Sequence, residues 1–541
     1  MLVGYVSDER YVALCDVVLE FDQDGQSAAI VRSTPRGAVY ADLKPGRYRV
    51  TLQKPGFGSK SVVVQVGAGE PYQFRLLSDH LLGYVWPKWV RSGERSEFRV
   101  HSTAPYRLSL WRYGLQKEYL RLLGWFDEHG PRAVMQITPD GDYTQTGVRW
   151  NSQGYGSLHH TQFVTGPERS GLYYLHAENE AGEFFSFPWI VAPAQPTAPI
   201  AVLASSINWN VYNNFGGRSN YVNSTGLPPT PTVNARLDLP RYAGTGFSEW
   251  GAASNDDFIP LSFERPELGN LVPKDAQITD SVGGRLASSM APAEWRLAGW
   301  LEREGFAYDY YAEPQLHDGT LDLDAYRVLI ISVHPEYWSR EMFTRVKRWV
   351  HERGGRLMYL GGNGLNCEIE FLDPATIRCK SQLISENGSL GMRDPNDPSI
   401  LYESRMHATL EAEASLLGVV TTETGIMTGA PYRALAADHW IFAGTGLKNG
   451  DIFGAKSQHE RCSGGASGHE TDKMSPSSPP GTQLLAKGLN PEDGGAEIVH
   501  YTTASGGQVF SVGSINYVLS LLVDEAISQI TANVVRKFLE A

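Results

Sequence analysis

The sequence predicts a multidomain protein in which two amino-terminal all-β sandwiches precede an α/β domain with a mainly parallel sheet. At 541 residues the chain is too long for a single hydrophobic core. Its first 195 residues contain short runs of strand-forming residues that Gly, Pro and Asp turns separate. After the Pro- and Ala-rich residues 192–199, strands and helices alternate, which is typical of a parallel sheet with right-handed crossovers. We therefore expect domains at residues 1–80, 81–195 and 196–541.

The first predicted sandwich, residues 1–80, consists of strand patterns alone. Its segment LKPGRYRVTLQKPGF, residues 43–57, contains no cluster of ionisable residues. This segment resembles the prealbumin-like repeat of carboxypeptidase regulatory domains. We expect this domain to serve in docking or in contacts between subunits.

The second predicted sandwich, residues 81–195, alternates apolar and polar residues and resembles an immunoglobulin-type domain. Its Trp and Tyr side chains could line a sugar-binding face, which would make the protein a non-catalytic carbohydrate-binding protein. Aromatic residues at alternating spacing more often pack in the core and on the sheet face. We therefore favour a packing role for them.

Composition excludes several classes of partner. A net charge of −13 is unsuited to nucleic acid or to an anionic membrane, because phosphate binding needs a basic face. No run approaches 18 apolar residues, so we expect no membrane span. The first residues lack the basic and apolar regions of a secretion signal. Four scattered cysteines are too few for a disulfide framework, and we expect a cytoplasmic protein.

Within the third predicted domain, residues 328–333, VLIISV, form a short apolar run without alternation. Such a run is typical of a strand that is covered on both faces. The amphipathic segments at residues 294–304 and 339–353 predict helices, which glycines at 305 and 354 end.

Polar residues follow three of the predicted strands in this domain. The carboxyl ends of parallel strands meet at one edge of a sheet, where ligands bind. We therefore expect these side chains to surround one crevice. They are Tyr212, Asn213, Asn214 and Tyr221 after residues 200–206, His334 and Glu336 after residues 328–333, and Asn363 after residues 356–362.

Two kinds of chemistry fit this set of residues. The turn GGNGLNC resembles the nucleophile turn of glutamine amidotransferases, but its elbow position holds Asn363, and Cys367 lies beyond the turn. A thiol mechanism at Cys367 is therefore the weaker alternative. No HExxH or CxxC motif indicates zinc. Tyrosine and glutamate oxygens instead suit a hard, highly charged ion such as ferric iron.

Seven segments of the third domain resemble the large (β) subunit of the N,N-dimethylformamidase family, in the family's order. They are PIAVLASSINWNVYNNFGGRSNY, LSFERP, WLEREGFAYDY, ISVHPEYW, RGGRLMYLGGNG, GGASGHE and TASGGQVFSVGSINYV. The resemblance implies a glutamine-amidotransferase-like fold over residues 196–541. It also implies hydrolysis of small amides, such as N-substituted formamides, at a single ferric ion held by two tyrosines and one glutamate.

Carried over residue by residue, the resemblance makes Glu336 the carboxylate ligand and Tyr212 the first phenolate ligand. At the second phenolate the nearest alignment places Trp250, which cannot bind iron. Tyr221 is the preferred substitute and Tyr242 the next.

The same resemblance assigns the catalytic residues. Glu470 would exchange protons with the attacking water and the departing amine, and His334 and Asn363 would line the pocket and donate to the oxyanion. Iron would act as a Lewis acid or lower the pKa of a bound water. The family pairs this subunit with a small helical one. Here we expect a homo-oligomer, with a small-subunit partner as the alternative.

Overall fold

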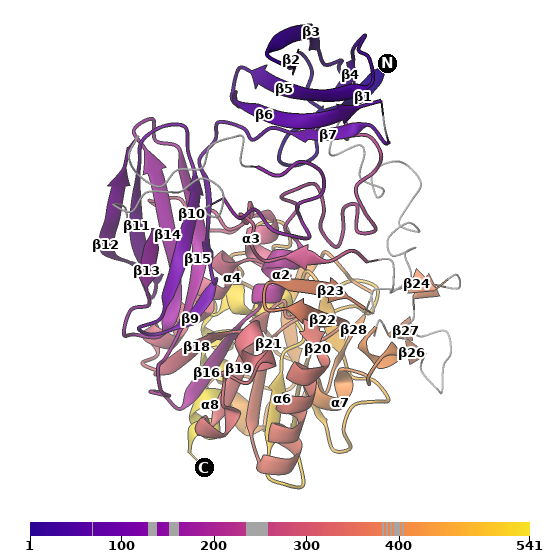
Figure 1. The fold of residues 1–541 in the computed structure, drawn as a ribbon. Coiled ribbons are helices and arrows are strands. Elements are labelled where there is room, and N and C mark those ends of the chain that lie inside the picture. The colour runs from indigo at the N-terminus through magenta and orange to yellow at the C-terminus, as the bar shows by residue number, and fades with distance from the viewer. Residues whose placement is uncertain are drawn as a thin grey trace.

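The structure is a computed structural model in which three units can be distinguished (Figure 1). It describes residues 1–67, 69–127, 138–150, 162–233, 258–380, 405–422 and 424–540, together with the backbone of four short strands between residues 384 and 402. Within the described residues, no helix is long and apolar enough to cross a membrane.

The amino-terminal unit consists of two small sheets around one apolar core. Its strands are β1 (Leu2–Ser7), β2 (Val18–Gln23), β3 (Gln26–Arg32), β4 (Ala38–Tyr40), β5 (Gly46–Lys54), β6 (Phe57–Val66) and β7 (Tyr72–Arg75). Strands β4, β1 and β7 form one sheet, and β3, β2, β5 and β6 form the other, in these orders. The buried side chains between them include Val6, Leu19, Val50 and Phe74.

The second unit also has two sheets. Its strands are β8 (Leu82–Trp86), β9 (Trp89–Arg91), β10 (Arg95–His101), β11 (Tyr106–Tyr113), β12 (Lys117–Phe126), β13 (Phe163–Thr165), β14 (Gly171–Asn179) and β15 (Phe184–Ala192). The sheet orders are β13-β10-β8 and β12-β11-β14-β15-β9. Most aromatic side chains of β14 and β15 are buried, whereas Tyr119 and Trp125 on the edge strand β12 are exposed. The aromatic residues therefore serve mainly in packing.

The carboxyl-terminal unit contains a nine-stranded sheet of mixed direction. Its strands, in spatial order, are β18 (Tyr308–Ala312), β16 (Ile200–Ala204), β19 (Val328–Val333), β21 (Arg356–Gly361), β36 (Gln508–Ser511), β35 (Glu497–Thr502), β34 (Gln483–Gly488), β30 (Tyr432–Ala434) and β31 (Ile452–Phe453). The strands from β18 to β36 are parallel. From β36 to β31 each neighbour is antiparallel.

The prediction of a mainly parallel sheet is therefore wrong for the second half of this sheet. Strands β35 and β36 are joined by residues 503–507 alone. A parallel pair needs a crossover of a dozen or more residues, so this short connection forces an antiparallel hairpin. The likeness to glutamine amidotransferase domains stays a prediction from the resemblance.

Helices cover both faces of the parallel half of the nine-stranded sheet, which consists of the strands from β18 to β36. The α-helices are α2 (Ser206–Val211), α3 (Gly284–Ser288), α4 (Ala291–Arg303), α5 (Glu313–His317), α6 (Arg340–Arg353), α7 (Ala414–Leu417) and α8 (Glu525–Leu539). The 3₁₀ helices are η5 (Leu323–Ala325), η6 (Met406–Ala408), η7 (Trp440–Phe442) and η8 (Ile515–Ser520). On β16, Val202 lies in the same apolar cluster as α4 and α8, whereas its neighbour Leu203 packs on the α6 side.

The ends of the predicted helices follow their sequence signals. The Ser339 hydroxyl accepts from the Met342 amide at the start of α6, and Gly354 ends this helix with φ 76°. Helix α4 also contacts the second unit, because the Trp295 indole donates to the Gly114 carbonyl at 2.7 Å. The α/β unit and the second sandwich thus share a packed boundary.

Small sheets and hairpins complete the carboxyl-terminal unit. Strands β17 (Leu261–Ser262), β23 (Thr376–Cys379), β22 (Cys367–Asp373) and β20 (Tyr337–Ser339) form one sheet. The pairs are β24 (Ile384–Ser385) with β25 (Gly388–Ser389), β26 (Met392–Arg393) with β27 (Leu401–Tyr402), β28 (Val420–Thr422) with β33 (Thr471–Lys473), and β29 (Gly429–Ala430) with β32 (Ser467–Gly468). Strand β20 begins just after Glu336, and β33 just after Glu470.

Candidate functional site

The carboxyl ends of β16, β19 and β21 deliver the candidate residues to one place. Helix α2 starts two residues after β16 and holds Tyr212 at its carboxyl cap. Strand β19 ends at Val333, whose φ of 61° turns the chain toward His334 and Glu336. Asn363 follows β21 with φ 48°. Left-handed backbone is uncommon for side chains such as these and often marks functional turns.

Three side chains form what we call the oxygen cluster: Tyr212, Tyr221 and Glu336. The Tyr212 hydroxyl donates to Glu336 Oε2 at 2.9 Å, and the Tyr221 hydroxyl lies 3.1 Å from the same oxygen. The two hydroxyls are 2.7 Å apart. Glu336 is buried, while both tyrosines keep part of their surface exposed. Tyr212 and Tyr221 therefore converge on one buried carboxylate, while Tyr242 and Trp250 lie outside the described residues.

Two further residues complete the surroundings of the oxygen cluster. The Tyr337 hydroxyl lies 2.6 Å from that of Tyr221. The Tyr212 and Tyr221 rings stack at a centroid distance of 4.5 Å, and the Arg285 guanidinium lies 4.4 Å from the centre of the Tyr212 ring. A cation over the face of these rings favours negative charge on their oxygens. Arg285 could not be predicted from the sequence, because α3 carries no recognisable motif.

His334 bridges the oxygen cluster to Glu470. Its Nε2 lies 3.3 Å from Glu336 Oε2 and 3.1 Å from Glu470 Oε2. On the other side of the ring, Nδ1 is 3.2 Å from the Ser289 hydroxyl. The Asn363 amide donates to Glu470 Oε2 at 2.7 Å. Six of the residues that the sequence singled out are thus connected by hydrogen-bond-length contacts: Tyr212, Tyr221, His334, Glu336, Asn363 and Glu470. The expectation that Asn213 faces the same crevice is wrong, because its amide donates to the Pro266 carbonyl at 2.8 Å instead.

Neighbouring polar groups fix the orientation of Asn363. Its Oδ1 accepts from Asn366 Nδ2 at 2.7 Å and from the Thr421 hydroxyl at 2.9 Å. Its backbone amide donates to Asp472 Oδ1 at 2.8 Å. Because the carbonyl oxygen is occupied by donors, the NH₂ group must face Glu470 and His334.

Burial and charge set the protonation of the site. Burial disfavours a charged His334, but the Glu470 and Glu336 carboxylates outweigh it and raise the His334 pKa. Burial also disfavours a charged Glu470, yet His334 and Asn363 lower the Glu470 pKa to about 2. Burial, then the Glu336 charge, raises the pKa of Tyr212 and of Tyr221 well above the usual value. The protein by itself therefore holds an imidazolium–carboxylate pair beside neutral phenols.

Two buried carboxylates anchor the start of α2 and hence the position of Tyr212. Glu294 Oε1 accepts from the Ser205 amide at 3.0 Å and from the Trp209 indole at 3.2 Å. Glu313 Oε2 accepts from the Ile207 amide at 2.8 Å. Burial raises the pKa of Glu294 to about 8. A six-residue helix has little stability of its own, so these contacts hold it in place.

The surroundings of Cys367 do not resemble those of an activated nucleophile. The residue is buried at the start of β22, and its sulfur accepts from Arg405 Nη1 at 3.9 Å. Burial raises the Cys367 pKa well above its usual value. In the described part of the chain, no hydrogen bond joins this thiol to a histidine.

Comparison with known proteins decides the family. Residues 123–530 match the family described as "N,N-dimethylformamidase beta subunit-like, C-terminal". The chain belongs to this family. The match includes every residue of the oxygen cluster, as well as Arg285, His334, Asn363 and Glu470. It begins inside β12, so the region that this dimethylformamidase family shares includes much of the second sandwich.

Two curated members of the family are similar to this chain. The N,N-dimethylformamidase beta subunit of Alcaligenes sp is 26% identical over 432 residues, which cover 69% of this chain and 53% of the relative. That of Paracoccus aminophilus is 26% identical over 413 residues, with 65% and 50% covered. The chain thus spans about half the length of these relatives.

Among solved structures, a glycosyl hydrolase family 2 member from Bacteroides cellulosilyticus matches 33% of this chain and 22% of its own. The identity is 10% and the TM-score 0.14. A likeness this low says nothing about the fold or function of the dimethylformamidase-like chain.

Proposed function

We propose that this protein is an iron-dependent hydrolase of small amides that acts on N-substituted formamides or related C–N bonds. Membership of the dimethylformamidase beta subunit-like family supports an amide substrate. The observation that carries the proposal is the convergence of the Tyr212 and Tyr221 hydroxyls on Glu336 Oε2, at 2.9 and 3.1 Å.

The oxygen cluster fits a hard, highly charged cation. Its donors are two phenol oxygens and a carboxylate, without sulfur, which is the type of ligand set that ferric iron prefers. The Tyr221 hydroxyl lies within hydrogen-bonding reach of the Tyr212 hydroxyl and of both Glu336 oxygens, and the Tyr212 hydroxyl lies within reach of Glu336 Oε2. Tyr212, Tyr221 and Glu336 would hold the ion, which would supply Lewis-acid activation of the amide carbonyl or of water.

The remaining residues of the site would manage protons and developing charge. Glu470 lies beside the cluster without joining it, and His334 and Asn363 hold its Oε2 atom. In this position Glu470 would accept a proton from the attacking water and return it to the departing amine. The Asn363 NH₂ group and His334 Nε2 face the same space and would donate to the oxyanion of the tetrahedral intermediate.

Ser289 has a positioning role in this scheme. Its hydroxyl lies 3.2 Å from His334 Nδ1, on the side of the ring away from both carboxylates. This contact fixes the ring so that Nε2 faces Glu336 and Glu470. A fixed orientation lowers the cost of organising donors around the developing charge.

The proposed assembly follows from the family rather than from the site. The curated relatives are named as beta subunits. We propose that this chain forms a homo-oligomer, or pairs with a small subunit, in the cytoplasm. The described residues contain no disulfide bond, which supports a reducing compartment.

Hydrolysis of a panel of formamides and acetamides by the purified full-length chain tests the proposal. We expect amine release that an iron chelator abolishes and added iron restores. Alkylation of thiols with iodoacetamide, and the substitution Cys367→Ser, should leave the rate unchanged. Loss of activity on alkylation with no effect of chelation would instead favour the cysteine mechanism.

A further inference from the structure

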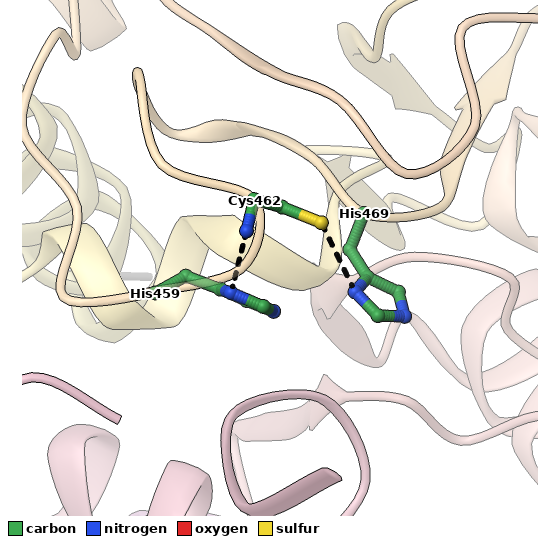
Figure 2. A group of neighbouring side chains, drawn as sticks. All are labelled: His459, Cys462 and His469. Carbon is green, nitrogen blue, oxygen red and sulfur yellow. Dashed lines mark hydrogen bonds between the residues drawn. The ribbon is translucent and has the colours of Figure 1, made fainter. Parts of the chain in front are cut away.

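A second group of ligand-type side chains lies in the loop that precedes Glu470. His459 and Cys462, which lie between β31 and β32, approach His469, which follows β32 (Figure 2). We call them the His–Cys–His cluster. The three residues are 1%, 2% and 7% exposed. Two imidazoles and a thiol that are buried together need either hydrogen-bond partners or a cation.

The distances within this cluster approach those of a tetrahedral metal site. One ligand atom from each residue lies within 4.8 Å of the other two. Cys462 Sγ and His469 Nδ1 are 3.5 Å apart. With Zn–S and Zn–N bonds of the usual length, a tetrahedral site places these two atoms about 3.6 Å apart.

The His459 ring is only partly satisfied by the protein. Its Nδ1 accepts from the Cys462 backbone amide at 3.0 Å. Its Nε2 is buried and has no hydrogen-bond partner in the described part of the chain. Because Nδ1 accepts, the single proton of the neutral ring lies on Nε2. Coordination of a cation through Nε2 would move that proton to Nδ1 and give up the hydrogen bond from the Cys462 amide, in return for a partner at the buried Nε2.

The backbone around the cluster is held in place without any metal. Asn516 Nδ2 donates to the Cys462 carbonyl at 2.7 Å and to the Gly465 carbonyl at 3.1 Å. Residue Val282 forms a parallel bridge with His459, and β32 pairs with β29 just before His469. The three side chains are therefore presented from a fixed frame, which lowers the entropy lost on binding an ion.

We propose that His459, Cys462 and His469 bind one zinc ion, with water as the fourth ligand. A donor set of two imidazoles and one thiolate suits Zn²⁺ and differs from the all-oxygen set of the oxygen cluster. On binding, the Cys462 thiol releases its proton to solvent, and the resulting thiolate forms the Zn–S bond.

The far side of the His469 ring connects the zinc site to Glu470. With Nδ1 facing Cys462, Nε2 faces Glu470 Oε1 at 4.0 Å. Metal-bound histidines commonly present their second nitrogen to a carboxylate, which orients both groups. Zinc would thus fix the loop that carries Glu470. This inference stands on the cluster alone and does not depend on iron in the oxygen cluster.

Metal analysis of the full-length chain tests the inference. Protein incubated with zinc sulfate and dialysed should retain about one zinc ion per chain, and Cys462→Ser and His459→Gln should retain less than about a tenth of that. The variants Cys15→Ser (exposed) and Cys367→Ser (buried) are matched controls and should keep the full amount. Iron, measured in the same samples, should be unchanged in all four variants. Loss of zinc without loss of iron therefore tests the zinc site alone and leaves the proposed iron-dependent function untouched.

A spectroscopic measurement on the unmutated chain guards against variants that fail to fold. Cobalt(II) added to chelator-treated protein should produce a thiolate-to-metal absorption band at one equivalent, and zinc should abolish it. Absence of that band, or a wild-type chain that retains no zinc after dialysis, would overturn the proposal. So would zinc retention that Cys462→Ser leaves unchanged.

Discussion

The oxygen cluster and the His–Cys–His cluster lie on either side of Glu470, yet they are built from opposite kinds of donor. Tyr212, Tyr221 and Glu336 offer oxygen alone, whereas His459, Cys462 and His469 offer nitrogen and sulfur. Hard cations prefer the first set and zinc the second. If both proposals hold, two centres with such different donors bind different metals without exchanging them.

The two clusters also differ in how the fold forms them. The oxygen cluster gathers residues from two separate strand ends, so its geometry depends on the whole parallel half of the sheet. The His–Cys–His cluster comes from one segment of eleven residues, from 459 to 469, which includes β32 and contacts Asn516 and β29. We therefore expect changes in the sheet to affect the first cluster while sparing the second.

The largest effect is expected from Glu336→Gln. An amide cannot provide the anionic oxygen that both tyrosines approach, so the protein should lose its iron, and amide hydrolysis should fall by about 10³-fold or more. The zinc content should stay unchanged. Elemental analysis and kcat/KM measure these outcomes. Glu497→Gln, which alters a buried carboxylate in β35 that accepts from the Met474 amide at 2.8 Å, is the control. If the Glu336→Gln variant retains its iron, Glu336 is not a ligand of the iron.

A smaller effect is expected from Glu470→Gln, which separates proton transfer from metal binding. Because Glu470 touches His334 and Asn363 rather than the tyrosines, the variant should keep both metals. Its kcat should fall by about 10²- to 10⁴-fold, the usual contribution of a general base. Loss of iron would move Glu470 into the ligand set, and a normal rate would remove it from the mechanism.

The smallest effect concerns stability and tests the anchor of α2. The Glu294 pKa is raised from 4.5 to about 8 in the folded protein. As the pH rises, the Glu294 side chain therefore ionises at a lower pH in the unfolded chain than in the folded protein. This carboxyl group therefore costs stability progressively between pH 4.5 and about 8, on the order of a few kcal/mol.

Glu294→Gln removes that titration. The difference in melting temperature between the variant and the wild type should be more positive at pH 8.5 than at pH 5. Thermal denaturation of both proteins at the two pH values measures this difference. A difference that does not change with pH would show that Glu294 is ionised in the folded protein.

The meeting of Tyr212, Glu336 and Asn363 could be predicted from the sequence because strand ends converge, whereas the choice of ligands among them came from the family resemblance. Glu336 and Asn363 follow apolar runs directly, and Tyr212 follows one after a single short helix, so their meeting required only a parallel sheet. Arg285 and Ser289 could not be predicted in this way. They reach the site from α3 and its end, a segment without periodicity or motif, through tertiary packing alone.

Two other features escaped prediction for separate reasons. The antiparallel half of the sheet depends on the short connection at residues 503–507, whose length the alternation of strands and helices in the rest of the domain does not reveal. The His–Cys–His cluster has the spacing H-x₂-C-x₆-H, which differs from the usual spacings of zinc sites. Its residues come together only because the loop folds back on itself.

The most direct test of the oxygen cluster is the visible absorption spectrum of the iron-loaded protein with Tyr212 replaced by Phe. A phenolate bound to ferric iron gives a charge-transfer band, and Tyr212→Phe removes one oxygen with almost no change in volume. We predict that this variant stays folded but loses the band, most of its iron and its activity. Tyr432→Phe, which deletes a buried hydroxyl that donates to the Val512 carbonyl at 2.9 Å in another part of the sheet, should keep all three. A Tyr212→Phe protein with full colour, full iron and full rate would contradict the account.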